Sequence, residues 1–279
     1  MRVLVTGANG QLGTDVVLRL KQLGHTAICA DISEMDITCP DAVRSFFARN
    51  LPDAVIHCAA YTAVDKAESD AQTCARINVD GTYNVACAAQ SCGAKLIYIS
   101  TDYVYSGEGT EPFDEHARIH PLNIYGKTKF EGEQAAKNCS RLFIVRTSWV
   151  FGLHGGNFVK TMLRLAESRD TLQVVCDQVG SPTFTQDLAV LLCDMLQTQA
   201  YGVYNATNEG FCSWYTFACT IFQMAGKDVL VQPICSQEYP SPAQRPHNSR
   251  LSKQALADAG FTPLPPWEDA LARFMQQLL

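Results

Sequence analysis

The sequence predicts an α/β fold, a doubly wound parallel sheet of the Rossmann type with a smaller C-terminal lobe. One observation is a glycine-rich turn over residues 7–13, which lies between an apolar run and an amphipathic segment. The other is the alternation of apolar runs with helical patterns over residues 1–150. Near-continuous apolar strands that alternate with helices are typical of a parallel sheet covered on both faces.

Residues 1–6 are the first expected strand, and residues 14–20 belong to the helix that follows the turn. The three glycines of the turn, Gly7, Gly10 and Gly13, allow a tight bend, the close approach of a pyrophosphate, and helix-on-strand packing. The exposed N–H groups and the positive dipole end of the helix then bind the anion. This segment therefore predicts a dinucleotide site.

The second strand, residues 26–30, ends at Asp31, about twenty residues after the turn, where an acid binds the ribose hydroxyls of the dinucleotide. The segment 31–36 contains further acids and no Arg or Lys, which favours NAD over a cofactor with a 2′-phosphate. Arg2, or a basic residue from elsewhere in the fold, would reverse that preference.

The alternation continues with a helix over 41–50, a strand over 54–60, a long helix over 67–91, a strand over 94–100, a helix around Tyr125 and a strand over 142–147. In such sheets the ligand binds at the carboxyl ends of the strands. The residues expected at those ends are Asn9, Gly10, Asp31, Ala60, Tyr61, Ser100 to Tyr103, Ser148 and Trp149.

Tyr125 and Lys129 form a Tyr-x-x-x-Lys pair on the predicted helix. Residues four apart share a helix face, so the ammonium can lower the pKa of the phenol and make it a proton donor at neutral pH. Such a short motif also occurs by chance on amphipathic helices. With the glycine turn before it, the pair predicts a hydride-transfer enzyme.

Composition excludes several classes of protein. The net charge of −6 and the absence of a basic run argue against nucleic-acid binding. No signal peptide is recognised and no apolar stretch is long enough to span a bilayer, so we expect a cytoplasmic protein. Among the twelve cysteines there is no C-x-x-C pair, and many lie in apolar segments, which predicts reduced core thiols at Cys29, Cys58, Cys87, Cys176, Cys193 and Cys219.

Beyond residue 150 the alternation weakens, a Pro-rich stretch covers 233–246, and two short helices are expected near the end of the chain. The pattern predicts a division near residue 150, with 1–150 as the dinucleotide-binding part and 151–279 as a smaller lobe. Segments 172–176 and 202–205 are candidates to rejoin the main sheet.

Several segments resemble the extended short-chain dehydrogenase/reductases, and within them the reductases of dTDP-linked 4-keto sugars. The resemblance covers nearly the whole chain. Its segments are Thr6–Gly13, Ala59–Glu68, Ser100–Tyr105, Tyr125–Lys129, Arg146–Val150 and Arg245–Leu251.

The resemblance implies reduction of the 4-keto group of dTDP-4-dehydro-L-rhamnose with NADPH or NADH, giving dTDP-L-rhamnose. Tyr125 would protonate the alkoxide, Lys129 would lower the pKa of Tyr125 and hold the nicotinamide ribose, and Thr101 would orient the keto oxygen. Ser100 is the alternative hydroxyl, and Thr101 is favoured because successive strand residues face opposite ways. The family's acceptance of NADPH conflicts with the acidic segment after Asp31.

The lobe over 151–279 is then expected to bind the nucleotide sugar, with sugar contacts from Asp102 and Trp149 and a diphosphate contact from Arg245. The predicted cofactor contacts are Gly7, Asn9, Gly10, Gln11, Leu12, Asp31, Asp36, Ile37, Ala60, Tyr61, Thr62, Ser100, Tyr125 and Lys129. A monomer or homodimer is expected. Some relatives hold magnesium between acidic residues at a dimer interface, but Asp15 has no assured partner here and Asp187 fits a helix N-cap better, so no metal site is predicted.

Two rival functions remain. A noncatalytic regulatory subunit, such as the beta subunit of methionine adenosyltransferase, is similar to these reductases and retains Tyr-Gly-Lys-Thr-Lys, but would not need the sugar-site Trp149 or the diphosphate Arg245. An epimerase or dehydratase acting on another nucleotide sugar would keep NAD tightly bound, and a dehydratase would want two carboxylates where Thr101-Asp102-Tyr103 offers one.

Overall fold

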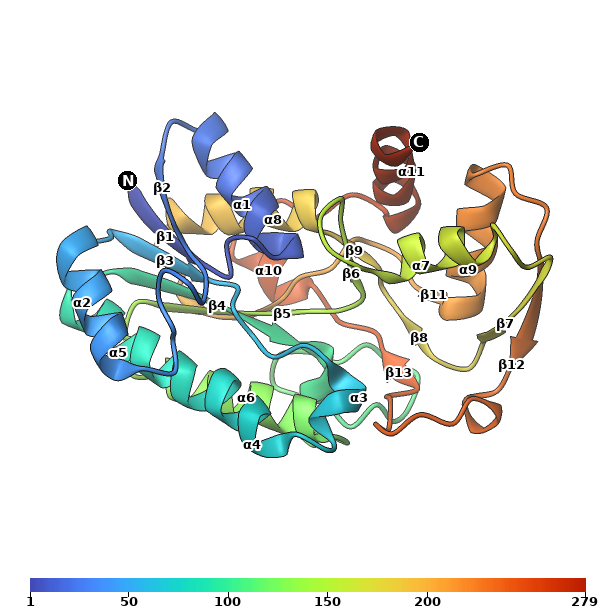
Figure 1. Cartoon of the computed structure of the whole chain (residues 1–279), viewed down its shortest axis with the longest axis horizontal. Helices are drawn as coiled ribbons and strands as arrows, with labels where there is room; N and C mark the ends of the chain where they lie inside the picture. The colour runs from blue at the N-terminus through green and yellow to red at the C-terminus, as the bar shows by residue number, and fades with distance from the viewer.

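Six parallel strands form the central sheet of the protein, whose computed structural model describes all 279 residues (Figure 1). The spatial order is β10-β5-β4-β3-β1-β2, and every neighbouring pair is parallel. The strands are β1 (Arg2–Thr6), β2 (Thr26–Ala30), β3 (Ala54–His57), β4 (Lys95–Thr101), β5 (Leu142–Thr147) and β10 (Gly202–Asn205). This arrangement confirms the predicted fold class.

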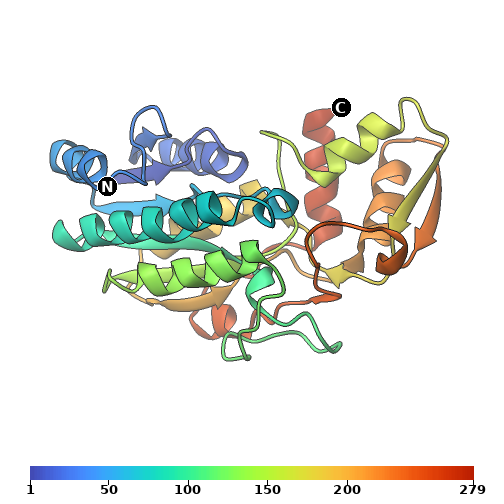
Figure 2. The ribbon, with the colours of Figure 1, turned by 60° about the horizontal axis from the view of Figure 1, so that its bottom comes forward.

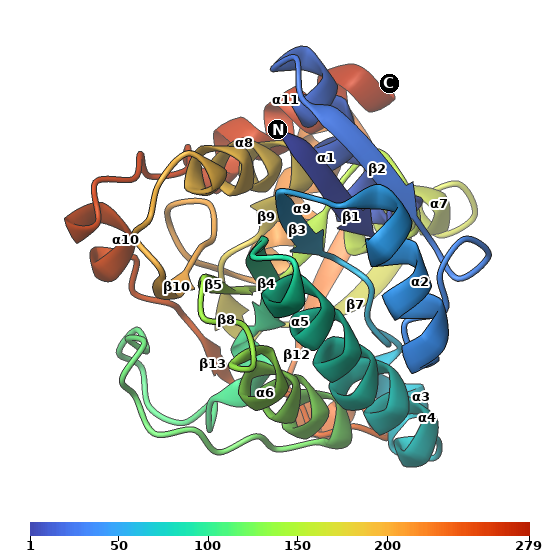
Figure 3. The ribbon, with the colours of Figure 1, turned by 90° about the vertical axis from the view of Figure 1, so that its left-hand side faces the viewer.

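Helices cover both faces of this sheet, as the view along it shows (Figure 3). On one face α1 (Gln11–Gln22) packs against α8 (Thr185–Leu196), and their buried apolar side chains join those of the strands in one core cluster. On the other face α2 (Pro40–Asn50), α5 (Thr82–Ser91) and α6 (Ile124–Ala136) bury a second cluster. The strands are buried on both sides, which explains their near-continuous apolar sequences.

A second lobe lies beyond the carboxyl ends of the strands (Figures 1 and 2). Its own core joins α7 (Phe158–Leu165), α9 (Trp214–Met224) and α11 (Trp267–Leu278) to short strands. These strands are β6 (Val150–Phe151) paired with β9 (Thr183–Phe184), β7 (Thr171–Val175) with β12 (Leu230–Ile234), and β8 (Val179–Gly180) with β11 (Cys212–Ser213) and β13 (Asn248–Ser249).

The chain crosses between the two lobes more than once. Strand β10, helix α8 and helix α10 (Gln254–Asp258) all pack with the central sheet, so segment 202–205 does rejoin it. The same expectation for segment 172–176 is wrong, because β7 pairs with β12 in the second lobe.

The helix expected over 67–91 is also wrong as a single element. It is divided into α3 (Val64–Ala67), α4 (Ala71–Ala75), a π-helical turn (Arg76–Gly81) and α5. The π turn widens the helix where the Asn78 side chain leaves it to bond the Tyr61 backbone, with Nδ2 also donating to Thr128 Oγ1 at 3.1 Å. Periodicity alone does not reveal such tertiary bonds.

The cysteine prediction is partly wrong. All twelve thiols are free, but of the six expected in the core only Cys193 is fully buried, and Cys29 is exposed because β2 is an edge strand. None of the helices combines the length and the apolar character that crossing a membrane requires.

Candidate active site

A cavity of about 810 Å³ lies at the carboxyl ends of the central strands, and the glycine turn forms one end of it. A Cβ at Gly13 would lie 2.1 Å from the Gly7 carbonyl oxygen, and Gly7 itself has a φ of +61°. Helix α1 starts here without a side-chain cap or an acid in its first turn. Free N–H groups, close backbone approach and a cavity of this volume fit a dinucleotide pyrophosphate.

Most of the predicted cofactor contacts line this cavity. They are Gly7, Gly10, Gln11, Leu12, Asp31, Ile37, Ala60, Thr62, Ser100, Tyr125 and Lys129. Asp31, at the end of β2, also accepts hydrogen bonds from the backbone N–H groups of Ile32 at 2.9 Å and Asn9 at 3.3 Å. One carboxylate thus fixes the turn and borders the cavity where a ribose would lie.

Three predicted cofactor contacts do not line the cavity: Asn9, Asp36 and Tyr61. Asp36 instead accepts bonds from the backbone and hydroxyl of Thr38, at 2.9 and 2.8 Å. The Tyr61 hydroxyl donates to Asp70 at 3.2 Å, and Asn9 is exposed. Their polar groups are therefore used mainly to shape the loops around the cavity.

Tyr125 and Lys129 stand one turn apart on α6 and line the same cavity, Lys129 buried and Tyr125 half-buried. The ammonium of Lys129 donates to the Ile99 carbonyl at 2.6 Å and lies 4.2 Å from the centre of the Tyr98 ring. Burial lowers the pKa of Lys129 to about 7, while the charge of Glu133 opposes that change.

The expected depression of the Tyr125 pKa by Lys129 is not what this structure gives. Burial raises the pKa of Tyr125 above its usual value and the Asp102 charge raises it further, while the nearby Thr101 side chain lowers it. The Lys129 ammonium interacts with the Ile99 carbonyl and the Tyr98 ring, and it is not among the groups that lower the pKa of Tyr125. Tyr125 is consequently a fully protonated phenol at neutral pH.

The two candidate hydroxyls at the end of β4 have different partners. Ser100 Oγ donates to the buried carboxylate of Glu133 at 2.6 Å. Glu133 also forms a bidentate pair with Arg146, at 2.8 and 2.7 Å. Thr101 faces the other way and donates to Asp102 Oδ1 at 2.9 Å, near Tyr125. The structure therefore brings Thr101, and not Ser100, to the phenol.

Asp102 lines the same cavity and is buried, with Oδ2 lacking a hydrogen-bond partner. Burial raises its pKa to about 6, although the nearby Ser249 side chain acts to lower it. Trp149 also lines the cavity and has a φ of +48°, a conformation that non-glycine residues adopt only where the surroundings enforce it. Both residues present groups suited to a sugar ring: an acceptor oxygen and an aromatic face.

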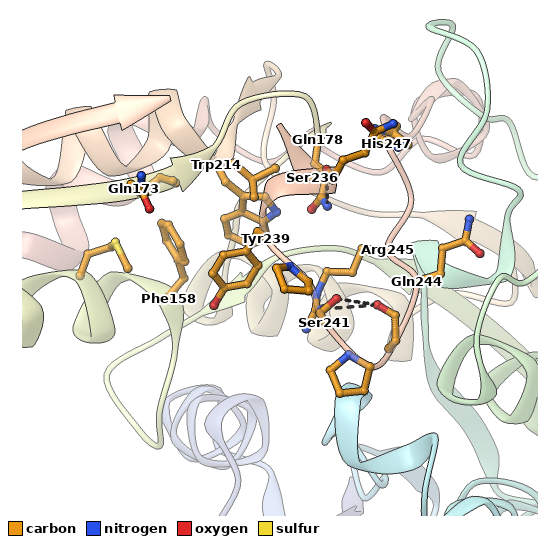
Figure 4. Close-up of a pocket in the computed structure, with 17 residues that line it drawn as sticks. Phe158, Gln173, Gln178, Trp214, Ser236, Tyr239, Ser241, Gln244, Arg245 and His247 are labelled. Atoms are coloured by element: carbon orange, nitrogen blue, oxygen red, sulfur yellow. Dashed lines mark hydrogen bonds between the residues drawn. The ribbon is translucent and has the colours of Figure 1, made fainter. Parts of the chain in front are cut away.

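A second cavity of about 590 Å³ lies in the smaller lobe and contains Arg245 (Figure 4). The two cavities adjoin at a tryptophan pair, since Trp149 of the first stacks on Trp214 of the second with ring centres 3.6 Å apart. Phe158 lies next to Trp214 at 4.6 Å. Arg245 thus lines the second cavity, in the lobe that offers a flat aromatic surface.

The two acids considered for a metal have protein partners. Asp15 is buried and accepts a bond from Thr185 at 2.5 Å. Asp187 is not the N-cap of α8, a position held by Phe184, but a first-turn acid that binds Arg273 through two bonds of 2.8 Å. The N-cap interpretation was wrong because the helix already begins at Thr185, which makes Asp187 its third residue.

Sequence reasoning missed Glu133 and Trp214. Glu133 could have been found, since it stands four residues after Lys129 on the same helix face, where a carboxylate stabilises the ammonium. Trp214 could not, because nothing in its local sequence pairs it with Trp149.

Comparison with known proteins agrees with this geometry. A family model described as the RmlD substrate binding domain matches residues 1–279. A dTDP-4-dehydrorhamnose reductase from Aggregatibacter actinomycetemcomitans is 41% identical, with 97% of each chain covered. The crystal structure of a dTDP-4-dehydrorhamnose reductase from Clostridium acetobutylicum is 43% identical with a TM-score of 0.98, covering 100% of this chain and 99% of that one. The corresponding enzyme from Bacillus anthracis, in complex with NADP, is 44% identical with a TM-score of 0.97 and covers 99% of each chain. The chain therefore belongs to the RmlD substrate binding domain family.

Proposed function

We propose that this protein is a reductase that converts dTDP-4-dehydro-L-rhamnose to dTDP-L-rhamnose with NADPH or NADH. The observation that supports this most is the placement of Tyr125, Thr101 and Lys129 at one end of a cavity whose other end is the glycine cradle. That arrangement puts a proton donor beside the place where a bound nicotinamide would supply hydride. The substrate is inferred from relatives named dTDP-4-dehydrorhamnose reductase, which match nearly the whole chain.

Different residues would bind the cofactor, supply the proton and orient the keto group. Gly7, Gly10 and the start of α1 would hold the pyrophosphate, and Lys129 would meet the nicotinamide ribose. Tyr125 carries the proton that a developing alkoxide at C4 needs, because its pKa is raised by burial. Thr101 would orient the keto oxygen by turning its single O–H from Asp102 to that oxygen, and donors of this kind lower the barrier by about 3–4 kcal/mol.

Binding of the sugar and its diphosphate falls to three further residues. The Asp102 carboxylate offers a free acceptor for a ring hydroxyl, and Trp149 offers an apolar face. Arg245 lines the second cavity, where the nucleotide would extend away from the reacting carbon. In this proposal residues 1–150 bind the dinucleotide, and 151–279 mainly bind the nucleotide sugar.

Two observations bear on the choice between NADH and NADPH, and they favour different cofactors. Asp31 at the ribose position favours NADH, because a carboxylate repels a 2′-phosphate. The 44% identical relative, however, was crystallised with NADP. We place the protein in the cytoplasm, where nucleotide sugars and reduced nicotinamides occur together, as a monomer or homodimer.

The test is to mix the purified protein with enzymatically prepared dTDP-4-dehydro-L-rhamnose and follow the oxidation of NADH and NADPH separately. Conversion to dTDP-L-rhamnose, identified by chromatography and mass spectrometry, is expected. The stereoisomer that differs at C3 and C5, dTDP-4-dehydro-6-deoxy-D-glucose, serves as the comparison substrate and should react more slowly. Nucleotide binding without turnover would favour the noncatalytic regulatory subunit, and cofactor that stays bound through purification would favour an epimerase or dehydratase.

A further inference from the structure

The two cavities come close together at Arg245 as well as at the tryptophan pair, because Arg245 of the second cavity bonds Asp65, the neighbour of Val64 in the first. Tyr103 lines the first cavity and packs edge-on against Tyr125 with ring centres 5.6 Å apart. Arg245 lines the second cavity, close enough to Tyr103 for each charge to affect the pKa of the other. A substrate with its sugar at Tyr125 and its base in the second cavity would therefore pass its diphosphate by Arg245.

Asp65 holds this arginine from the other lobe. Its Oδ2 accepts a hydrogen bond from Arg245 Nη2 at 2.7 Å, and its Oδ1 accepts one from the Ala243 backbone N–H at 3.3 Å. Ala243 is completely buried, and its carbonyl in turn accepts bonds from Ser241 Oγ at 2.8 Å and Arg245 Nη1 at 3.5 Å (Figure 4). One carboxylate thus fixes both the loop and the guanidinium that the loop presents.

The position of Asp65 ties this contact to the cofactor side. Asp65 is the second residue of the short helix α3, and the first residue, Val64, lines the first cavity. The bond to Arg245 lowers the pKa of Asp65, so the carboxylate is charged over the whole physiological range. Arg245 is partly buried, with 27% of its side chain exposed, and N–H groups remain free because a guanidinium has five.

We propose that Asp65 is a positioning residue for the nucleotide sugar: it holds the Arg245 guanidinium at the junction of the two cavities, aimed at the diphosphate. This inference rests on the proposed function, because it takes the substrate to be a nucleoside diphosphate sugar. A guanidinium that is already held in place binds phosphate oxygens in a defined orientation. Less conformational entropy is then lost on binding than with a mobile arginine, so the affinity is higher. Asp65 also offsets the positive charge, so recognition depends on directed bonds more than on net charge.

The experiment measures dTDP binding by calorimetry and steady-state kinetics for the full-length Asp65→Ala variant. The dissociation constant for dTDP and the KM for the nucleotide sugar should each rise about tenfold with kcat little changed, because the lost contact is made equally in the ground state and the transition state. Asp65→Asn, which keeps an oxygen acceptor, should recover part of the loss. The dissociation constant for NADPH should not change.

A double-mutant cycle separates positioning from a general effect on the fold. In an Arg245→Gln background, Asp65→Ala should add no further loss of dTDP affinity, because the group it positions is gone. Asp41→Ala is the matched control: it removes the acid of an exposed ion pair with Arg44 on α2, neither residue of which lines a cavity, and should leave both constants unchanged.

Equal losses of affinity in the wild-type and Arg245→Gln backgrounds would overturn the proposal, as would an unchanged affinity in Asp65→Ala. Wild-type protein that binds dTDP but does not turn over the sugar would contradict the proposed function while the cycle still tests Asp65. Wild-type protein that does not bind dTDP would contradict both.

Discussion

Tyr125 and Lys129 lie in surroundings that disfavour the charged form of each side chain, so the pKa of the phenol rises and that of the ammonium falls. Burial keeps the phenol protonated and lowers the pKa of the ammonium to about 7. The sequence could show that these side chains share a helix face, but not that Lys129 bonds the Ile99 carbonyl. The direction of the Tyr125 shift follows mainly from burial, to which the charge of Asp102 on another element adds, so spacing alone could not predict it.

Lys129 should destabilise the folded protein at and below neutral pH. Its pKa is about 7 in the folded chain and 10.5 in the reference state, so between these values the unfolded chain binds more protons and stability rises with pH. Lys129→Met should therefore raise Tm by roughly 5 °C at pH 6. The advantage should shrink as the pH approaches 10, as measured by scanning calorimetry of both proteins at pH 6, 8 and 10. A gain in Tm that is constant or grows with pH would refute this account of Lys129.

The two neighbouring hydroxyls of β4 should differ in their effect on activity. Thr101→Val removes the hydroxyl near Tyr125 and its bonds to Asp102 and the Tyr103 backbone, so it should lower kcat about 100-fold and Tm by several degrees. Ser100→Ala removes a bond to the buried Glu133 and should lower Tm by several degrees while costing far less activity. Steady-state kinetics and thermal unfolding of the two variants check this, and the opposite ranking of kcat would return Ser100 to the catalytic role.

At the scale of elements, the glycine turn was predictable because its residues are adjacent in sequence. Gly7, Gly10 and Gly13 meet each other within one turn, so their spacing already contains the geometry. The π-helical turn at Arg76–Gly81 was not predictable, since it depends on the bonds that Asn78 makes to a loop and to α6. The same holds for the tryptophan stack, whose members come from β5's end and α9.

Gly13→Ala tests the glycine cradle. The added methyl would meet the Gly7 carbonyl oxygen at 2.1 Å, which forces the turn apart. We expect a loss of about 1–3 kcal/mol in the free energy of unfolding and a rise of at least about 100-fold in the dissociation constant for NADPH. Gly202→Ala is the matched control, because its methyl would make only ordinary contacts from 3.4 Å. NADPH binding that survives in Gly13→Ala would show that the cofactor does not use this turn.

At the scale of the whole molecule, the dinucleotide-binding part is not continuous in sequence. Helix α8, strand β10 and helix α10 complete the core beneath α1, although all three follow residue 150. The alternating pattern identified the first five strands of the sheet in order, and it identified segment 202–205 as a candidate sixth. It assigned segment 172–176 wrongly because a short apolar run does not reveal which sheet it joins.

This interleaving predicts that residues 1–150 do not fold alone. Without α8 and β10, the apolar face of α1 and one edge of the sheet would be exposed to water. A fragment ending at residue 150 should lack a cooperative thermal transition and fail to bind NADPH, as judged by circular dichroism and calorimetry. A fragment that unfolds cooperatively and binds the cofactor would contradict this view of the core.

The proposed reaction is defined by the carbon that receives hydride and by the residue that supplies the proton. The most direct measurement uses a nicotinamide cofactor deuterated at C4 of the reduced ring, and locates the label in the product by NMR for the wild-type protein and for Tyr125→Phe. We expect deuterium at C4 of dTDP-L-rhamnose with the wild type, and a rate reduced about 10²–10⁴-fold with Tyr125→Phe while dTDP still binds. Label at another carbon, or turnover undiminished in the Phe variant, would contradict it.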